Sequence, residues 1–282
     1  MYEQYQPRPI FNGSARTKAD FILSSPECRF SSLTSKEVDD LAVMWSFYSA
    51  KIEDNAYSLA ETQALLIDGI AADKPLRDTS MLNSLYDVFS SLARIVRQHG
   101  PQPIDRDMAL ALHSTISAKL PEDAARSSLC NRSMLRWGKG NTAPSSEQNI
   151  RACFELILEG QEAYDDPLEK AVYLYCNLSH LQMCISGNEY TSRTVESLAL
   201  MNADVIPLYS IRAQDIEQHC TTLMHYYETG EYGPYVGYFL DRQLRRVLDV
   251  LPMRDEQTRN RIERILAPER AEHERIPLWR EL

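Results

Sequence analysis

The feature that most constrains the fold of this chain is a helix-start signal that recurs along the sequence. Thr34 is followed three residues later by Glu37, a spacing that predicts a capping box. Ser58 and Glu61 repeat the same spacing, and apolar residues follow both pairs at helical intervals. Asp166 provides a third start, because it can cap a helix whose first position is the proline that follows it.

Helical spacing of apolar residues extends over nearly the whole sequence. Only 10 of the 282 residues are glycine, and no stretch of useful length alternates between apolar and polar residues as a strand would. Hydrophobic residues make up 44% of the chain, which is enough to bury a core. We therefore predict an all-α helical bundle, with helices that begin near positions 34, 58, 81, 105, 145, 166, 191, 210 and 234.

The chain divides into three parts by pattern. Residues 1–34 are expected to be irregular, because prolines at 7, 9 and 26 interrupt any period. Residues 35–251 form one predicted domain, and residues 252–282 form a charged helical tail. Within the domain, residues 121–146 lack a helical period, and a stretch of this length without regular structure is usually a functional loop.

Charge and composition limit the possible partners and compartments. The formal net charge of -10 argues against nucleic-acid binding, which needs a basic surface. No basic start followed by an apolar stretch marks a secretion signal, and no apolar run is long enough to span a membrane. The six cysteines form no C-x-x-C pair, which indicates the reduced thiols of a cytoplasmic protein. Delivery to another cell and self-association both stay open.

A short turn at 182–193, "QMCISGNEYTSR", separates two apolar helical stretches. Gly187 and Asn188 can adopt the left-handed conformations that an anion-binding turn needs. The first turn of the following helix has unpaired N–H groups, and Arg193 could reach back to the same anion. The alternative is that Gly-Asn here is only a tight turn between helices.

This stretch resembles the signature of the Fic (Fido) family, H-P-F-x-(D/E)-G-N-G-R-x-x-R, and aligns with it without gaps. Gly187 and Asn188 match the family's Gly-Asn, and Arg193 matches its last arginine. The flanking helical stretches and the segment "YYETGEYGPYVGYF" at 226–239 also resemble the family, so the likeness covers roughly 35–251. The resemblance implies a helical bundle that binds ATP and Mg²⁺ and transfers AMP to a protein hydroxyl. It also implies that residues near 134–146 form a flap that docks a target or partner protein.

The proton-accepting and metal-binding positions of the signature are altered. Gln182 replaces the histidine that serves the family as general base, and a glutamine cannot accept a proton near neutral pH. Ser186 replaces the acidic residue that holds Mg²⁺ in the family. His180 is a fallback base two residues upstream, but two helical positions turn a side chain to nearly the opposite face.

Three further signature positions are altered. Cys184 replaces the phenylalanine, and Tyr190 replaces the first arginine. Glu189 replaces the second loop glycine and puts a carboxylate where the resemblance places phosphates. We therefore predict a degenerate site that lacks standard AMP transfer and acts by binding a partner or a nucleotide-like ligand. The alternative is an active enzyme that transfers AMP or another phosphate-containing group with altered residues.

A second stretch resembles the family's class with an N-terminal inhibitory helix, whose motif is (S/T)-x-x-x-E-(G/N). Ser49 and Glu53 match the motif, Asp54 departs from it, and Asn55 follows; the helix is expected at about 36–54. The resemblance implies that Glu53 pairs with Arg193 and blocks the nucleotide's γ-phosphate. The residues alone allow such a pair across a bundle, and they equally allow a solvated glutamate on a surface helix.

A rival set of residues could bind zinc. Cys176, His180 and Cys184 recur at intervals of four and so share one helical face. No fourth ligand is evident nearby, and we interpret the three as small side chains on a core stripe. We therefore predict no metal site and no cofactor from the residues themselves; ATP and Mg²⁺ enter only through the resemblance.

Overall fold

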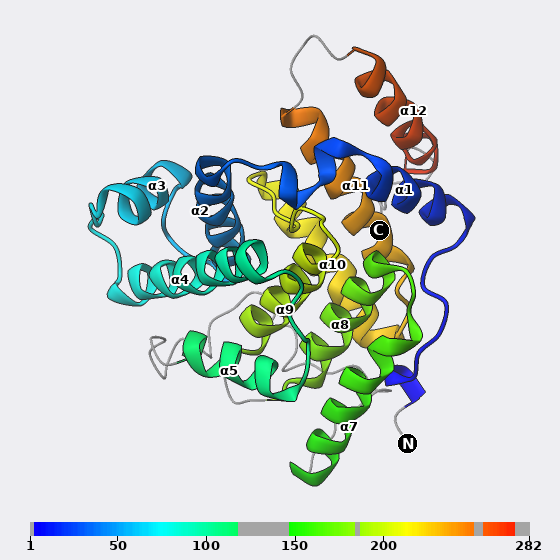
Figure 1. Cartoon of the computed structure of the whole chain (residues 1–282), viewed down its shortest axis with the longest axis horizontal. Coiled ribbons are helices and arrows are strands. Elements are labelled where there is room, and N and C mark those ends of the chain that lie inside the picture. Colours follow the sequence, from blue (N-terminus) through cyan, green and yellow to red (C-terminus); the bar gives the residue numbers. More distant parts are fainter. Residues whose placement is uncertain (1–2, 118–146, 184–186, 251–255, 274–282) are drawn as a thin grey trace, which may run out of the picture.

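The chain folds into a bundle of α-helices (Figure 1). The structure is a computed structural model, and it describes residues 3–117, 147–183, 187–250 and 256–273. Within these ranges there is no strand, and one isolated antiparallel bridge joins Arg29 to Val205. The predicted all-α class is therefore confirmed.

Most helices that follow one another in the sequence are joined by short connections. The α-helices are α1 (Gly13–Ser24), α2 (Ser35–Ile52), α3 (Leu59–Asp68), α4 (Leu76–His99), α5 (Arg106–Ser117), α7 (Glu147–Gly160), α8 (Pro167–Leu181), α9 (Asn188–Asn202), α10 (Ala213–Thr229), α11 (Gly233–Val250) and α12 (Glu256–His273). Short 3-10 turns lie at Glu3–Tyr5, Pro26–Cys28, Phe30–Ser32 and Gln161–Ala163.

The predicted helix starts are present where local chemistry defines them. The Thr34 hydroxyl accepts from the Glu37 N–H and the Glu37 carboxylate accepts from the Thr34 N–H, so the capping box is complete. A second complete box opens α3. The Asp166 carboxylate accepts two backbone N–H groups at the start of α8, ahead of the proline at the first helical position.

The expectation of an irregular segment through residue 34 was wrong for its central part. Residues 13–24 form α1, and the Asn12 side chain caps it by accepting from the Ala15 N–H. The prolines at 7, 9 and 26 lie outside α1, so they bound this helix and do not interrupt it. Lys18 pairs with Asp241 of α11 at 2.8 Å, which ties the N-terminal helix to the bundle.

The start of α10 also differs from the sequence expectation. The helix expected from residue 210 begins at Ala213, after the N-cap residue Arg212, and the Ser210 hydroxyl ahead of it bonds the Asp215 carboxylate of its first turn at 2.5 Å. The tail contains a helix, α12, as expected. The three-part division of the chain stays a prediction.

The two central helices, α8 and α9, form an antiparallel pair in the middle of the molecule (Figure 1). Every residue of α9 from Asn188 to Met201 is buried, as is α8 from Ala171 to Leu181. Helices α2 and α4 also lie side by side, with the rings of Trp45 and Phe89 stacked 4.7 Å apart between them. The end of α8 and the start of α9, which border the turn, are therefore packed among the surrounding helices.

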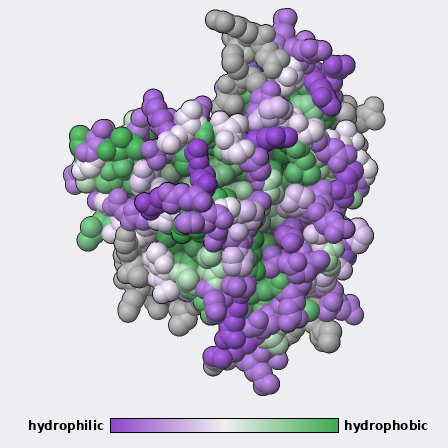
Figure 2. Space-filling model, in the orientation of Figure 1, coloured by the Kyte–Doolittle hydropathy of each residue, from purple (hydrophilic) through white to green (hydrophobic). Residues whose placement is uncertain are grey.

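On the face that Figure 2 shows, the described residues are mainly hydrophilic. Hydrophobic side chains gather over α3 and the connection after it, where Ile67, Ile70 and Leu76 are exposed. Among the helices of the described ranges, none is long and apolar enough to cross a membrane.

Candidate functional site

The turn between α8 and α9 is bounded by two residues in the left-handed conformation. Gln182 caps the end of α8 with φ 49°, and Gly187 precedes α9 with φ 75°. A Cβ on Gly187 would lie 3.1 Å from the Ser117 Oγ of α5, so glycine is favoured by both backbone and space. Cys184 and Ser186 lie outside the described residues.

The Gln182 amide is held by the residues of the turn itself. Its Nε2 donates to the Glu189 carboxylate at 3.1 Å and to the Ser179 carbonyl, and its Oε1 accepts from the Asn188 amide at 3.3 Å. An amide in this arrangement has no basic lone pair to offer. The side chain at the base position therefore positions Asn188 and Glu189 and does not move protons.

Glu189 points into the protein, where it is 4% exposed. Its Oε1 accepts from the Tyr227 hydroxyl at 2.9 Å as well as from Gln182, and its Oε2 has no hydrogen-bond partner among the described residues. Burial raises the pKa of Glu189 to about 7, while the Arg193 charge lowers this pKa and Glu53 raises it. Near neutral pH the carboxyl is therefore divided between its neutral and charged forms.

Tyr190, at the position of the family's first arginine, faces away from the turn. Its hydroxyl donates to the Met81 sulfur of α4 at 3.0 Å, and its ring lies 5.3 Å from the Arg193 guanidinium carbon. Burial raises the pKa of this phenol, so it stays neutral. The Tyr190 side chain therefore packs in the core between α9 and α4.

The contact expected between Glu53 and Arg193 is present. Glu53 caps α2, and its carboxylate lies 3.1 Å from the Arg193 Nη2, with both residues buried. The pair is not bidentate, because the same Nη2 also donates to the Ser49 carbonyl at 3.4 Å. The Arg193 Nε and Nη1 have no hydrogen-bond partner among the described residues. Ser49 contributes its backbone oxygen, and its hydroxyl makes no bond there.

Carboxyl groups outnumber guanidinium groups around Arg193. Glu196, one helical turn further along α9, accepts from the Tyr235 hydroxyl at 2.9 Å, and burial raises its pKa to about 8. Together with Glu53 and Glu189 it gives three buried carboxyls that interact with the Arg193 charge. Because Arg193 already pairs with Glu53 and two further carboxyls lie near it, the cluster offers no positive excess to an anion.

His180, the fallback base, lies in the aromatic core. Its Nδ1 bonds the Tyr5 hydroxyl at 2.7 Å, and its ring lies 5.6 Å from the Tyr227 ring. Burial lowers the pKa of His180 to about 4. The imidazole thus anchors the N-terminal segment to α8, as the opposite-face argument anticipates for a side chain two positions from Gln182.

Sequence reasoning missed His113, an imidazole of α5 that lies against the turn. Its Nδ1 bonds the Thr191 hydroxyl at 3.1 Å, and its Nε2 bonds the Ser117 hydroxyl at 3.2 Å. Half-burial lowers its pKa, so the ring is neutral at physiological pH. In the sequence, the only feature that marks His113 is Ser117 four residues later. That spacing does not indicate a contact with the turn between α8 and α9.

The described residues do not fit a Mg²⁺–triphosphate at this turn. The Glu189 carboxylate is engaged by Gln182 and Tyr227, and Tyr190 is turned into the core. Burial raises the pKa of the Cys176 thiol, which disfavours the thiolate that zinc needs, and Cys184 of the rival zinc set lies outside the described residues. Within the described ranges, no group of histidine, cysteine and acidic side chains is placed to hold a metal.

Comparison with solved structures reveals similar folds at low sequence identity. A Fic family protein from Desulfovibrio desulfuricans G20 matches with a TM-score of 0.66 and 14% identity, over 93% of this chain and 86% of its own. A variant fragment of Fic-1 from C. elegans matches with a TM-score of 0.65 and 16% identity, over 84% of this chain and 70% of its own.

A second Fic-1 fragment from C. elegans has a TM-score of 0.60 and 17% identity, over 84% of this chain and 69% of its own. No family model matches the sequence, and no curated protein does. The likeness is therefore one of backbone arrangement across most of the chain. The helical bundle, its central α8–α9 pair and these structural matches together show that the chain has the fold of Fic-family proteins.

Proposed function

We propose that this protein is a degenerate Fic-domain protein, a pseudoenzyme that lacks standard protein AMPylation and acts by binding. The observation that carries the proposal is the hydrogen-bonded set formed by Gln182, Asn188, Glu189 and Tyr227. These side chains satisfy one another across the turn where the family resemblance places a nucleotide. The base position holds an amide, and the space for phosphates is bordered by a carboxyl.

Electrostatics supports the same conclusion. Two like charges 4 Å apart repel by about 1 kcal/mol in bulk water and about 4 kcal/mol at the effective dielectric constant near a protein surface. A triphosphate at the Gly187 turn would face an ionised or half-ionised Glu189 at neutral pH. Arg193 offers little compensation because Glu53 already occupies its Nη2. A neutral or singly charged nucleotide-like ligand would suffer this repulsion less.

In this proposal the Glu53–Arg193 ion pair has a structural role and is not autoinhibitory. It joins the end of α2 to the first turns of α9, and both side chains are buried. In the inhibitory-helix class that Ser49 and Glu53 resemble, the pair blocks a γ-phosphate. In this chain the general base and the metal-binding residue of the signature are replaced, so the ion pair serves to hold α2 against α9.

The partner in this proposal is a protein that docks along the flap at 134–146, and these residues lie outside the described ranges. A cytoplasmic location is part of the same proposal. It rests on the absence of a pairing motif among the six cysteines and on the free thiols at Cys28, Cys153, Cys176 and Cys220.

The alternative function is AMP transfer, or transfer of another phosphate-containing group, to a protein hydroxyl with altered residues. The observation that favours it is His113, a neutral imidazole that contacts the same turn through Thr191. Gly187, Asn188 and Arg193 also remain at their signature positions. In this alternative His113 takes the place of the missing base, from α5 and not from α8.

One experiment separates the two functions. Calorimetric titration with ATP and Mg²⁺ is followed by a transfer assay with labelled ATP, on the wild-type protein and on Glu53→Gly. The proposal expects no heat of binding at millimolar ATP, which corresponds to a binding free energy weaker than about -4 kcal/mol, and no labelled product. Label transferred by Glu53→Gly and lost in Glu53→Gly/His113→Ala would refute the proposal and establish the alternative.

A further inference from the structure

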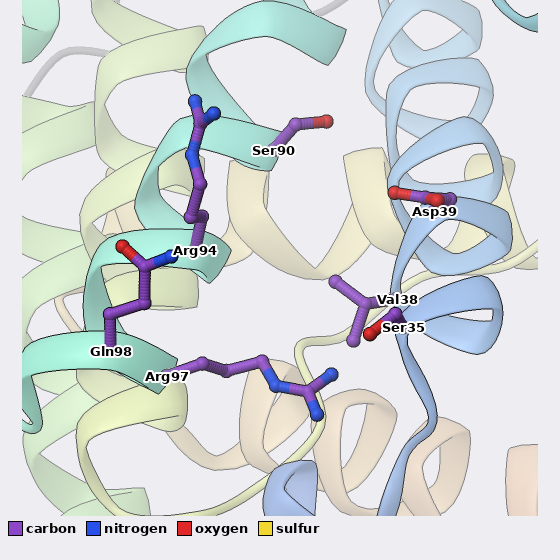
Figure 3. Close-up of a pocket in the computed structure, with 7 residues that line it drawn as sticks. All are labelled: Ser35, Val38, Asp39, Ser90, Arg94, Arg97 and Gln98. Carbon is purple, nitrogen blue, oxygen red and sulfur yellow. The ribbon is translucent and has the colours of Figure 1, made fainter.

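A groove of about 530 Å³ lies between α2 and α4, away from the α8–α9 turn. Ser35, Val38 and Asp39 line it from the first turns of α2, and Arg94 and Arg97 line it from the second half of α4 (Figure 3). Its volume is within the range of about 300–1,000 Å³ that is usual for binding pockets. No residue of the turn between α8 and α9 lines this groove.

The two arginines give the groove a positive side. Arg94 and Arg97 are exposed and three positions apart on α4, so they share one face of that helix. Neither guanidinium makes an ion pair or a hydrogen bond with any residue that the structure describes. In a chain with a formal net charge of -10, two adjacent uncompensated arginines in a groove are available for an external carboxylate.

The α2 side of the groove adds to the attraction for an anion. Ser35 is the first residue of α2, whose N-terminal end carries a partial positive charge. The capping box uses the N–H of Glu37, and the Ser35 N–H has no backbone acceptor in the described ranges. Figure 3 shows Arg97 extending across the groove toward Ser35 and Val38. Arg97 and the start of α2 thus place positive charge in one part of the groove, and Arg94 extends away from them along the α4 wall toward Ser90.

The α2 wall of the groove also carries an apolar and an acidic side chain. Val38 is buried and supplies an apolar wall, and Asp39 supplies a carboxylate next to it. A ligand with negative charge along its whole length would meet Asp39. A ligand with separated carboxylates and an apolar side chain between them would meet the two arginines on the α4 wall and Val38 on the α2 wall.

We propose that this groove binds a short acidic peptide segment of a partner protein. Two carboxylates spaced to reach Arg94 and Arg97 provide charge-assisted hydrogen bonds, and an apolar side chain packs on Val38. Asp39 repels a carboxylate placed beside it on the α2 wall, so the peptide residue that meets Asp39 is not acidic. Peptide carboxylates suit this site better than nucleic acid, whose continuous phosphates would encounter both Asp39 and the acidic surface of the chain.

This surface is independent of the proposed binding at the α8–α9 turn. Glu53 lies at the opposite end of α2, about 22 Å from Val38 along the helix axis at 1.5 Å per residue. Substitutions in the groove therefore leave the Glu53–Arg193 pair intact. Failure of peptide binding would not bear on nucleotide binding, and the reverse also holds.

The test uses fluorescence anisotropy with the full chain and a fluorescein-labelled peptide of alternating glutamate and leucine. Matched peptides carry glutamine or lysine in place of glutamate. The proposal expects binding of the glutamate peptide at low salt that weakens as salt rises, and at least about tenfold weaker binding of the other two. Equal binding of the glutamate and glutamine peptides would overturn the proposal.

Protein variants locate the binding on the surface. Arg97→Glu and Arg94→Glu should each weaken binding of the glutamate peptide about tenfold. Arg264→Glu, on exposed α12, changes the net charge equally and should leave the affinity within about twofold. Asp39→Asn should tighten binding about threefold, a gain that partial unfolding cannot produce. Equal effects of Arg97→Glu and Arg264→Glu, or no gain with Asp39→Asn, would contradict the assignment.

Discussion

Replacing Glu53 by alanine leaves the Arg193 guanidinium without its carboxylate in the protein interior. The two side chains are 6% and 2% exposed and lie 3.1 Å apart. Removing one partner of such a buried pair costs about 3–5 kcal/mol, because the remaining charge is neither paired nor solvated. We expect a loss near 3 kcal/mol, since Arg193 already has two nitrogens without partners and so gains less than full satisfaction from the pair.

A nearby group moderates the loss. Glu53 raises the pKa of Glu189, so its removal lets Glu189 ionise more readily and partly compensate Arg193. The Glu53→Ala/Glu189→Gln double variant should therefore lose more stability than Glu53→Ala, beyond the effect of Glu189→Gln itself. This result would assign the compensation to the Glu189 carboxylate.

The assay is urea denaturation followed by circular dichroism, with a double-mutant cycle. Arg193→Met combined with Glu53→Ala should be less destabilised than the sum of the two single variants, with a coupling of about 2 kcal/mol. Glu155→Ala is the control, since Glu155 pairs with Arg106 at a similar 3.2 Å but with side chains 42% and 53% exposed. That change should cost below about 1 kcal/mol. Additive single effects, or a loss for Glu53→Ala no larger than for Glu155→Ala, would refute the reasoning.

Three other predictions concern the turn and its buried carboxyls. The free energy of unfolding should fall as pH rises from about 5 through 8. Burial raises the folded-state pKa values of Glu189 and Glu196 to about 7 and about 8, so the folded protein holds protons that the unfolded chain has already lost, and this contribution to stability disappears as pH passes the folded-state values. Glu189→Gln and Glu196→Gln should each flatten the pH profile in urea titrations. Gly187→Ala should cost about 1–2 kcal/mol in the same assay, because φ is 75° there; a variant as stable as wild type would contradict the left-handed turn. Gln182→His should not produce transfer from labelled ATP, because Glu189 and Tyr227 still border the turn; labelled product would show that the base alone was missing.

Local chemistry allowed much of the architecture to be predicted. A capping box such as Thr34–Glu37 is closed by residues three apart, so its formation depends on little beyond its own sequence. The same is true of Asp166 at the start of α8. The prolines near α1 misled the prediction, because prolines outside a helix look the same in the sequence as prolines that break one.

The candidate site was only partly predictable. The spacing of Gly187, Asn188 and Arg193 placed the turn, and the resemblance to a family motif paired Arg193 with Glu53, which the structure brings together. No pattern indicated that Glu189 would bond Gln182 and Tyr227. Tyr190 could not be assigned to the Met81 side of the core, because its neighbour lies on a helix more than a hundred residues away in the chain.

The sequence by itself determined that the chain is helical, where most helices begin, and which signature groups for proton and phosphate chemistry are missing. These properties depend on side-chain identity and on spacings within one or two helical turns. Only the tertiary structure decided that His113 lies on the turn, that His180 lies in the core, and that Arg94 and Arg97 line a groove between α2 and α4. Such contacts depend on how helices pack, which is a property of the whole chain and not of any one segment.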